Sequence, residues 1–196
     1  MAERHGVAPG GALTGEGALR LGRPRFECEL KDGTKIIVRL LSCEDLPACA
    51  EFFACCSPRS LYSRYERVPV EAPFELAKKL CFPAEDSQFT LIAEATIDGS
   101  ERVLGVAQLL SDPEHQVAEF AVLVADPWQG RGLGARFADR TLELARTWGI
   151  RRVIAEFLPE NVRIIRIVES RAFRLHRDAG GQIVSAEKEI PDSSTS

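Results

Sequence analysis

The segment best suited to hold a ligand is Gln129-Gly130-Arg131-Gly132-Leu133-Gly134, in which three glycines alternate with other residues. An apolar, strand-like run, Val122-Leu123-Val124-Ala125, precedes it, and a helical pattern over Leu133–Trp148 follows it. Glycine has no Cβ and lets a ligand approach the backbone closely. The first turn of a helix has unpaired N–H groups and the positive end of the helix dipole. The pattern therefore predicts a binding site for a diphosphate.

Two known phosphate-binding motifs fit this glycine loop less well. A P-loop ends in Gly-Lys-Ser/Thr, whereas the chain reads Gly134-Ala135-Arg136, which excludes it. A dinucleotide fingerprint fits the glycines and Ala135, with Glu156 about 20 residues further on. However, four residues separate Ala125 from Gly130, and about 40 residues follow Glu156, too few to complete a doubly wound sheet. A glycine-rich turn that binds no ligand is the remaining alternative.

The same hexapeptide matches the Q/R-x-x-G-x-G/A motif of the general N-acetyltransferase (GNAT) superfamily, which the chain resembles. The match includes the preceding strand and the following helix. Further on, Leu158-Pro159-Glu160-Asn161 and Ala172-Phe173 resemble the second motif of that superfamily. The resemblance extends over roughly residues 36–190. It implies the acyl-CoA N-acyltransferase fold and acetyl-CoA as co-substrate.

Within the superfamily the chain resembles the bacterial protein-lysine acetyltransferases. The resemblance rests on Ser57-Pro58-Arg59-Ser60-Leu61-Tyr62-Ser63-Arg64-Tyr65, on Ala118-Glu119-Phe120-Ala121-Val122 and on Leu158-Pro159-Glu160-Asn161. It implies an amine acceptor on a protein, for example a lysine of an acyl-CoA synthetase. A small-molecule amine acetyltransferase acting on a polyamine, amino acid or drug is the first alternative. A non-catalytic acyl-CoA-binding sensor is the second.

The resemblance also implies roles for individual residues. Amides of the glycine loop would bind the CoA diphosphate, and the preceding strand would pair its backbone with the pantetheine arm. Asn161 would begin the next helix beside that arm, and asparagine is also a good N-cap. Arg131 would add charge to a phosphate, unless it is a solvated loop arginine. The predicted cofactor-binding residues are Val122, Leu123, Val124, Gln129, Gly130, Arg131, Gly132, Leu133, Gly134 and Asn161.

Amine acetylation requires a base. A lysine amine has a pKa near 10.4, so at pH 7 about one in 2,500 is neutral. Deprotonation at this pH therefore costs a free energy of roughly 4.6 kcal/mol. Glu119 lies three residues before Val122, on the strand that leads into the glycine loop. The matching glutamate is the general base in the protein-lysine acetyltransferases that the chain resembles, and a carboxylate can take this proton directly or through water. A solvent-facing strand glutamate is the alternative, and the reserve candidates are Glu94, Glu114 and Glu156.

The leaving CoA thiolate has no obvious protein acid. Many members of the superfamily place a tyrosine seven residues after the asparagine, and here that position is Val168. The lysine-acetylating subfamily also tends to lack it, and a CoA thiol is acidic enough to leave unaided. The resemblance also implies that backbone N–H groups around Val122 donate to the tetrahedral intermediate. Tyr62, Arg64 and Tyr65 either line the acceptor mouth or, as we favour, are core aromatics with a surface arginine.

The composition narrows the class of protein. The chain has 196 residues, 45% of them apolar, and a net charge of −4, which suits one domain with a full core. A nucleic-acid binder would carry a basic excess. No apolar run approaches about 18 residues, so we expect no membrane span and a cytoplasmic protein. The six cysteines form no C-x-x-C pair and the three histidines are far apart, so we expect reduced thiols and no metal site.

The elements that position these residues add up to an α+β fold, a mixed, mostly antiparallel sheet flanked by helices. We expect a tail over residues 1–24, one N-acetyltransferase domain over 25–190 and a second tail over 191–196. Capping signals predict helices over Cys43–Cys55, after Ser57-Pro58 and after Ala72-Pro73. Helices are also expected over Gly132–Trp148 and Asn161–Ser170. The expected strands are Phe26–Leu30, Thr34–Leu40, Phe89–Ile97, Arg102–Leu110, Gln116–Val124, Arg152–Leu158, Phe173–His176 and Ile183–Ile190.

Overall fold

The computed structural model describes residues 25–83 and 88–191. Its strands are β1 (Arg25–Glu29), β2 (Lys35–Leu40), β3 (Gln88–Ile97), β4 (Ser100–Ser111), β5 (Val117–Val124), β6 (Arg152–Phe157), β7 (Arg174–Arg177) and β8 (Val184–Glu189). Its helices are η1 (Cys43–Asp45), α2 (Leu46–Ala54), α3 (Pro58–Tyr65), α4 (Pro73–Cys81), η2 (Asp126–Trp128), α5 (Leu133–Trp148) and α6 (Val162–Glu169). The predicted tail 1–24 lies outside the described residues, and of the predicted tail 191–196 only Pro191 is described.

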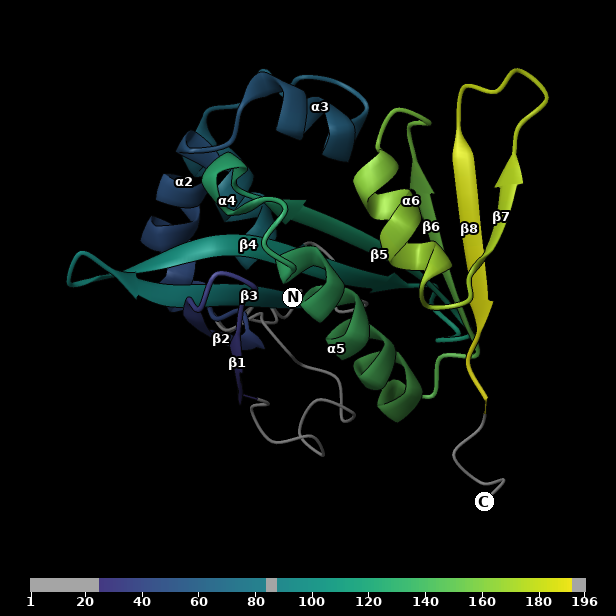
Figure 1. The fold of residues 1–196 in the computed structure, drawn as a ribbon, viewed down its shortest axis with the longest axis horizontal. Helices are drawn as coiled ribbons and strands as arrows, with labels where there is room; N and C mark the ends of the chain where they lie inside the picture. The colour runs from purple at the N-terminus through teal and green to yellow at the C-terminus, as the bar shows by residue number, and fades with distance from the viewer. Residues whose placement is uncertain (1–24, 84–87, 192–196) are drawn as a thin grey trace, which may run out of the picture.

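The strands form one sheet in the order β1-β2-β3-β4-β5-β6-β8-β7 (Figure 1). Neighbouring strands are antiparallel except β5 and β6, which are parallel and joined by α5. The predicted α+β class and the mixed, mostly antiparallel sheet are therefore confirmed. The order of the last strands was not predictable from the pattern, because β8 lies between β6 and β7.

Two hydrophobic cores cover the two faces of the sheet. Helices α5 and α6 pack on one face through residues such as Phe137 and Val168, and α2 and α4 pack on the other through residues such as Phe52. Strand β3 is buried on both faces, because successive side chains of a strand point to opposite sides. Leu91 accordingly belongs to the first core and Ile92 to the second.

The first predicted helix begins later than expected. Residues Cys43–Asp45 form a 3-10 turn, and the α-helix runs over Leu46–Ala54 rather than Cys43–Cys55. The predicted capping box is present: Ser42 accepts from the backbone of the turn, and the Asp45 carboxylate accepts from the Ser42 N–H at 2.7 Å. Proline in the first turn of α2 has no N–H to donate, which suits it to a helix start at Leu46.

Strands β5 and β6 pair over three residues each and then separate. Val117, Ala118 and Glu119 pair with Arg152, Val153 and Ile154. Beyond this point β5 continues along β4 as far as Val124, while β6 continues along β8 as far as Phe157. Figure 1 shows the two strands diverging, with α3 and α6 near the opening. The gap leaves one backbone edge of each strand without a strand partner.

The described residues contain no helix with the length and apolar character needed to cross a membrane. They also contain no group of three or more His, Cys, Asp or Glu side chains that could bind a metal ion. All six cysteines are free thiols, and Cys49, Cys56 and Cys81 are buried.

Candidate active site

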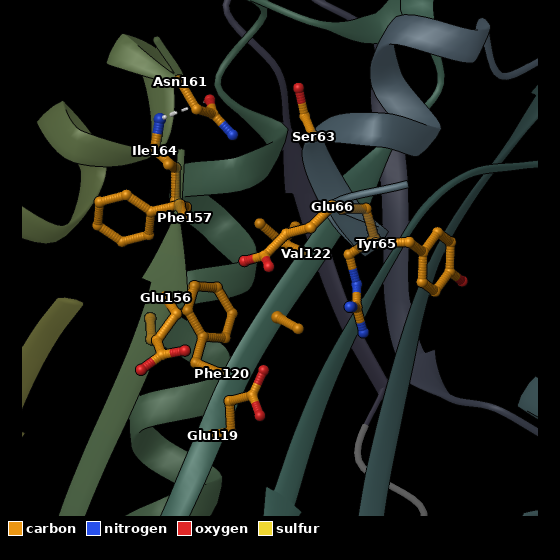
Figure 2. Close-up of a pocket in the computed structure, with 13 residues that line it drawn as sticks. Ser63, Tyr65, Glu66, Glu119, Phe120, Val122, Glu156, Phe157, Asn161 and Ile164 are labelled. Atoms are coloured by element: carbon orange, nitrogen blue, oxygen red, sulfur yellow. Dashed lines mark hydrogen bonds between the residues drawn. The ribbon is translucent and has the colours of Figure 1, made fainter. Parts of the chain in front are cut away.

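A cavity of about 260 Å³ lies where β5 and β6 separate. Its walls come from the end of α3, from the middle of β5, from the end of β6 and from the start of α6 (Figure 2). The lining residues are Ser63, Arg64, Tyr65, Glu66, Glu119, Phe120, Ala121, Val122, Ala155, Glu156, Phe157, Asn161 and Ile164.

Glu119 is the last residue of β5 that pairs with β6. Its neighbours Ala118 and Phe120 are buried in the core beneath α5, so the Glu119 side chain points to the opposite face of the sheet. It is solvent-exposed and lines the cavity. The carboxylate is therefore accessible from the cavity.

Two further carboxylates line the same cavity. Glu156 comes from β6, two residues beyond the partner of Glu119 in the register, and therefore points to the same face of the sheet. Glu66 follows α3 and has a positive φ of 55°, which ends that helix and directs the chain back to the cavity. The basic residue of the lining, Arg64, donates to Gln108 Oε1 at 2.6 Å. The cavity is thus suited to a cationic acceptor (Figure 2).

The open edge of β5 presents backbone hydrogen-bonding groups to the gap. At the two ends of the β4–β5 ladder, Ala125 N bonds to Leu104 O at 3.0 Å and Asp112 N bonds to Val117 O at 2.9 Å. The register between them is unbroken, so odd-numbered residues of β5 bond to β4 and even-numbered residues face β6. The N–H and C=O of Val122 therefore point into the gap, which is the orientation that pairing with an extended ligand would require.

The neighbouring residues of β5 differ from Val122. Val124 also faces the gap, but its carbonyl already accepts from Gln129 Nε2 at 2.9 Å. Leu123 directs its backbone to β4, and its buried side chain packs in the core beneath α2 and α4. Leu123 therefore does not present its backbone or its side chain to a ligand, and its role is to hold β5 in place.

The glycine loop ends in a helix start without a side-chain cap. The first intrahelical bond of α5 runs from Arg136 N to Gly132 O at 3.2 Å. The N–H groups of Leu133, Gly134 and Ala135 precede it and have no partner within the helix. At this uncapped start of a 16-residue helix, the amides and the helix dipole both favour an anion.

The three glycines of the loop serve different purposes. Gly130 and Gly132 have φ of 78° and 97°, which other residues adopt only with strain. A Cβ on Gly134 would lie 3.0 Å from Ile167 Cδ1 of α6. The first two glycines thus shape the turn, and the third lets α6 approach the start of α5.

The charged side chain of the loop has a partner elsewhere in the fold. The Arg131 guanidinium forms an ion pair with Asp32, in the turn between β1 and β2, and its Cζ lies 4.6 Å from the centre of the Trp128 ring. The backbone N–H of Lys31 donates to Arg131 O at 3.0 Å, which fixes this turn against the loop. The hydrogen bond from the Thr34 N–H, opposed by partial burial and helped by Arg131, keeps the pKa of Asp32 below its usual value.

Gln129 connects the loop to two other elements. Its Nε2 donates to Ser60 Oγ of α3 at 2.8 Å, and its Oε1 accepts from Arg163 of α6. Ser60 in turn donates to Asp126 Oδ1 at 3.0 Å, and Ser57 N donates to Asp126 Oδ2 at 2.8 Å. Burial raises the pKa of Asp126, but these hydrogen bonds outweigh it and hold the pKa below its usual value. Both the nitrogen and the oxygen of the Gln129 side-chain amide are therefore occupied by hydrogen bonds within the protein.

The Acetyltransferase (GNAT) family model matches residues 49–173, which is more than half of the chain. The chain belongs to this family. It is 27% identical over 166 residues to Acetyltransferase PA5475 of Pseudomonas aeruginosa, covering 85% of this chain and 83% of that protein. The GNAT domain of S. lividans PAT superposes with a TM-score of 0.72 at 24% identity, covering 85% of this chain and 97% of the other.

Spermidine N-acetyltransferase from Vibrio cholerae, solved with CoA and spermine, has the same fold. It superposes with a TM-score of 0.63 at 17% identity and covers 79% of this chain and 95% of the other. The GNAT fold uses acetyl-CoA, and the chain is an acyltransferase of this family.

The remaining predicted positions fall in different parts of this GNAT domain. Asn161 lines the cavity and also caps α6, its Oδ1 accepting from Ile164 N at 3.4 Å. Val168 is fully buried in the core and brings no polar group to the cavity. Tyr62 is 46% exposed, so the core interpretation is wrong for this residue, whereas Tyr65 is largely buried and lines the cavity.

Two of the reserve base candidates lie outside the cavity lining. Glu94 is 7% exposed and forms a buried ion pair with Arg39, with Glu94 Oε2 2.6 Å from Arg39 Nη2. Glu114 is exposed in the turn between β4 and β5. Glu156 lines the cavity beside Glu119. The sequence did not predict the positions of Glu66 and Arg163, because neither residue belongs to a GNAT motif or to another recognisable local pattern.

Proposed function

We propose that this protein transfers the acetyl group of acetyl-CoA to a primary amine, with Glu119 as general base and a protein lysine side chain as acceptor. The observation that carries the proposal is the gap between β5 and β6, which has Glu119 at its closed end and the uncapped start of α5 beyond Val124. A diphosphate on the α5 amides and a pantetheine arm along β5 would direct a thioester towards Glu119.

The reaction needs few groups from the protein. Glu119 accepts a proton from the ammonium, directly or through water, and the neutral amine attacks the thioester carbonyl. The Val122 N–H, which faces the gap, is suited to donate to the oxyanion of the tetrahedral intermediate. The C–S bond then breaks, CoA leaves as a thiolate, and the nitrogen of the new amide loses its second proton to solvent. Unaided departure fits a buried Val168 at the position where many GNAT members have a tyrosine.

A protein acceptor is supported by exposed apolar side chains in the segment that runs from α3 into α4. Apolar side chains are exposed on α3, on the segment after it and at the start of α4, and they are Tyr62, Val68, Val70 and Phe74. The α3 residues that line the cavity belong to the same stretch of chain. Exposed apolar side chains on the stretch of chain that also forms part of the cavity wall are suited to contact a folded partner that presents one lysine.

The test of this function is an assay of acetyl transfer from acetyl-CoA, in which the release of free CoA is measured. The acceptors are intact acyl-CoA synthetases, lysine peptides and small amines. Turnover on an intact protein, with acetyl-lysine found by mass spectrometry, supports the proposal. Turnover confined to small amines contradicts the protein acceptor. Tight binding of acetyl-CoA without turnover on any amine would favour an acyl-CoA-binding sensor.

One observation favours a second candidate function, acetylation of a small polycation. Three carboxylates line one cavity, those of Glu66, Glu119 and Glu156, and they suit an acceptor with more than one ammonium group.

We expect Glu156→Gln to raise the KM of a lysine peptide by roughly threefold while the KM of acetyl-CoA stays unchanged, because one attractive charge is lost. Steady-state kinetics measure both constants.

The control for this prediction is Glu169→Gln, which removes an exposed carboxylate at the far end of α6. It should leave both KM values unchanged. If Glu156→Gln weakens spermine much more than a lysine peptide, and spermine is the faster substrate, the small polycation becomes the better description of the acceptor.

The proposal also predicts that Asp32→Asn tightens CoA binding. The substitution removes a negative charge near the diphosphate site and releases Arg131 from its ion pair. Asparagine keeps the oxygen that accepts from Thr34 N, so the turn is retained. We expect the Kd for CoA to fall by roughly twofold to fivefold, the effect of one exposed charge pair. Calorimetry at low salt checks it, and a weaker CoA complex contradicts it.

A further inference from the structure

Arg163 is the second residue of α6 and contacts the glycine loop directly. Its Nη1 donates to Gln129 Oε1, across 34 positions of sequence. Gln129 Nε2 bonds to Ser60 Oγ and to the Val124 carbonyl, so the orientation of its amide is fixed with Oε1 towards Arg163. The guanidinium is therefore oriented at the first residue of the loop rather than moving freely in solvent.

The packing of α6 on α5 defines where this guanidinium lies. Arg163 precedes Ile167 by one helical turn and shares its face of α6. Ile167 contacts the start of α5 so closely that a Cβ on Gly134 would lie 3.0 Å from its Cδ1. Just beyond α6, Arg171 donates to the Ala135 carbonyl at 2.8 Å. The face of α6 that carries Arg163 is thus directed at the uncapped first turn of α5.

The charges of the two arginines near the loop differ in availability. Arg131 is paired with Asp32, so its positive charge is largely offset. Arg163 contacts the neutral amide of Gln129, and within residues 25–83 and 88–191 no carboxylate forms an ion pair with it. Arg163 also remains solvent-exposed and lies outside the cavity lining that would receive the amine. Its positive charge is therefore available to a ligand on the loop side.

We propose that Arg163, rather than Arg131, supplies the side-chain positive charge that binds the diphosphate of CoA at the start of α5. The inference rests on the proposed function, because it takes CoA as the ligand of the α5 amides. A guanidinium presents several N–H donors in a plane, so Arg163 can keep its bond to Gln129 and still donate to a phosphate oxygen.

The test compares wild type, Arg163→Gln and Arg146→Gln by calorimetry with CoA and with 3′-dephospho-CoA. Arg146 is an exposed residue in the last turn of α5, so its variant loses the same charge far from the loop. We expect Arg163→Gln to raise the Kd of both ligands by about tenfold, because a charged hydrogen bond is lost. The slope of log Kd against log salt should also become shallower for this variant only. Arg163→Lys, which keeps the charge, should recover part of the affinity.

Each other outcome is decisive. Equal Kd values for Arg163→Gln and Arg146→Gln, with both variants folded by circular dichroism, overturn this inference and leave the proposed function intact. A loss seen with CoA but absent with 3′-dephospho-CoA assigns Arg163 to the ribose phosphate and overturns the diphosphate assignment. No CoA binding by wild type overturns the proposed function itself.

Discussion

Glu119→Gln is expected to lower kcat/KM for the amine acceptor by roughly 10² to 10³ at pH 7, with an unchanged Kd for acetyl-CoA. Glutamine keeps the size of the side chain but cannot accept the proton, and general-base assistance contributes effects of this order. Without it, the rate depends on the rare neutral amine, whose fraction rises tenfold per pH unit up to a pKa near 10.4. The deficit of the variant should therefore shrink as the pH rises towards 10. Steady-state kinetics over pH 6.5–10 measure it.

The chain offers a matched control for this base. Glu114 is an exposed glutamate of the turn that precedes β5, outside the cavity lining, and Glu114→Gln should behave as wild type. Full activity in Glu119→Gln would rule out the proposed base. If the loss appears instead in Glu156→Gln, the base is the neighbouring carboxylate on β6, which lines the same cavity.

The features that sequence reasoning predicted well depend on local signals. Ser42 and Ser57 cap the turns that follow them, and Gly149 ends α5 with a φ of 81°. Such signals act over a few residues, so they can be recognised in the sequence without knowledge of the tertiary fold. The glycine loop is of the same kind, since the positive φ angles of Gly130 and Gly132 are a property of the turn itself.

The features that it missed depend on contacts between distant segments. The gap between β5 and β6 requires β6 to continue along β8, and β8 comes from near the end of the chain. The Arg131–Asp32 pair spans 99 positions of sequence, and the Glu66 side chain reaches the cavity through the position of α3. No local pattern encodes these arrangements, because they follow from the way the two cores pack on the sheet.

Arg39→Met is expected to lower the free energy of unfolding by about 3 kcal/mol, as is typical when one partner of a buried ion pair is removed. The Arg39 guanidinium bonds to both oxygens of Asp45, at 2.8 and 2.7 Å, and to Glu94 Oε2 at 2.9 and 2.6 Å. Glu94 is 7% exposed, so the substitution leaves a nearly buried carboxylate next to a second one, with the exposed Arg25 guanidinium 4.0 Å away as its remaining cation. Urea unfolding at pH 7 measures the change.

The pH dependence of this loss has a defined sign. Burial raises the pKa of Asp45, but hydrogen bonds from Arg39 and from the Ser42 N–H outweigh it, so the pKa lies below the usual value of 3.8. A carboxyl whose pKa is lowered by folding stabilises the fold above the pKa of the unfolded chain, and this contribution is lost as the pH falls through the folded pKa. The difference between wild type and Arg39→Met should therefore be largest near neutral pH and shrink below about pH 4.

Two comparisons separate the buried network from a general effect of charge. Arg152→Met removes an exposed partner of Glu187, 3.8 Å away, and should cost less than about 1 kcal/mol. Adding Glu94→Leu to Arg39→Met should recover part of the lost stability, because a buried charge that has lost its closest partner is then removed. If the double variant is less stable than Arg39→Met alone, packing of the side chains rather than the unpaired carboxylate accounts for the loss.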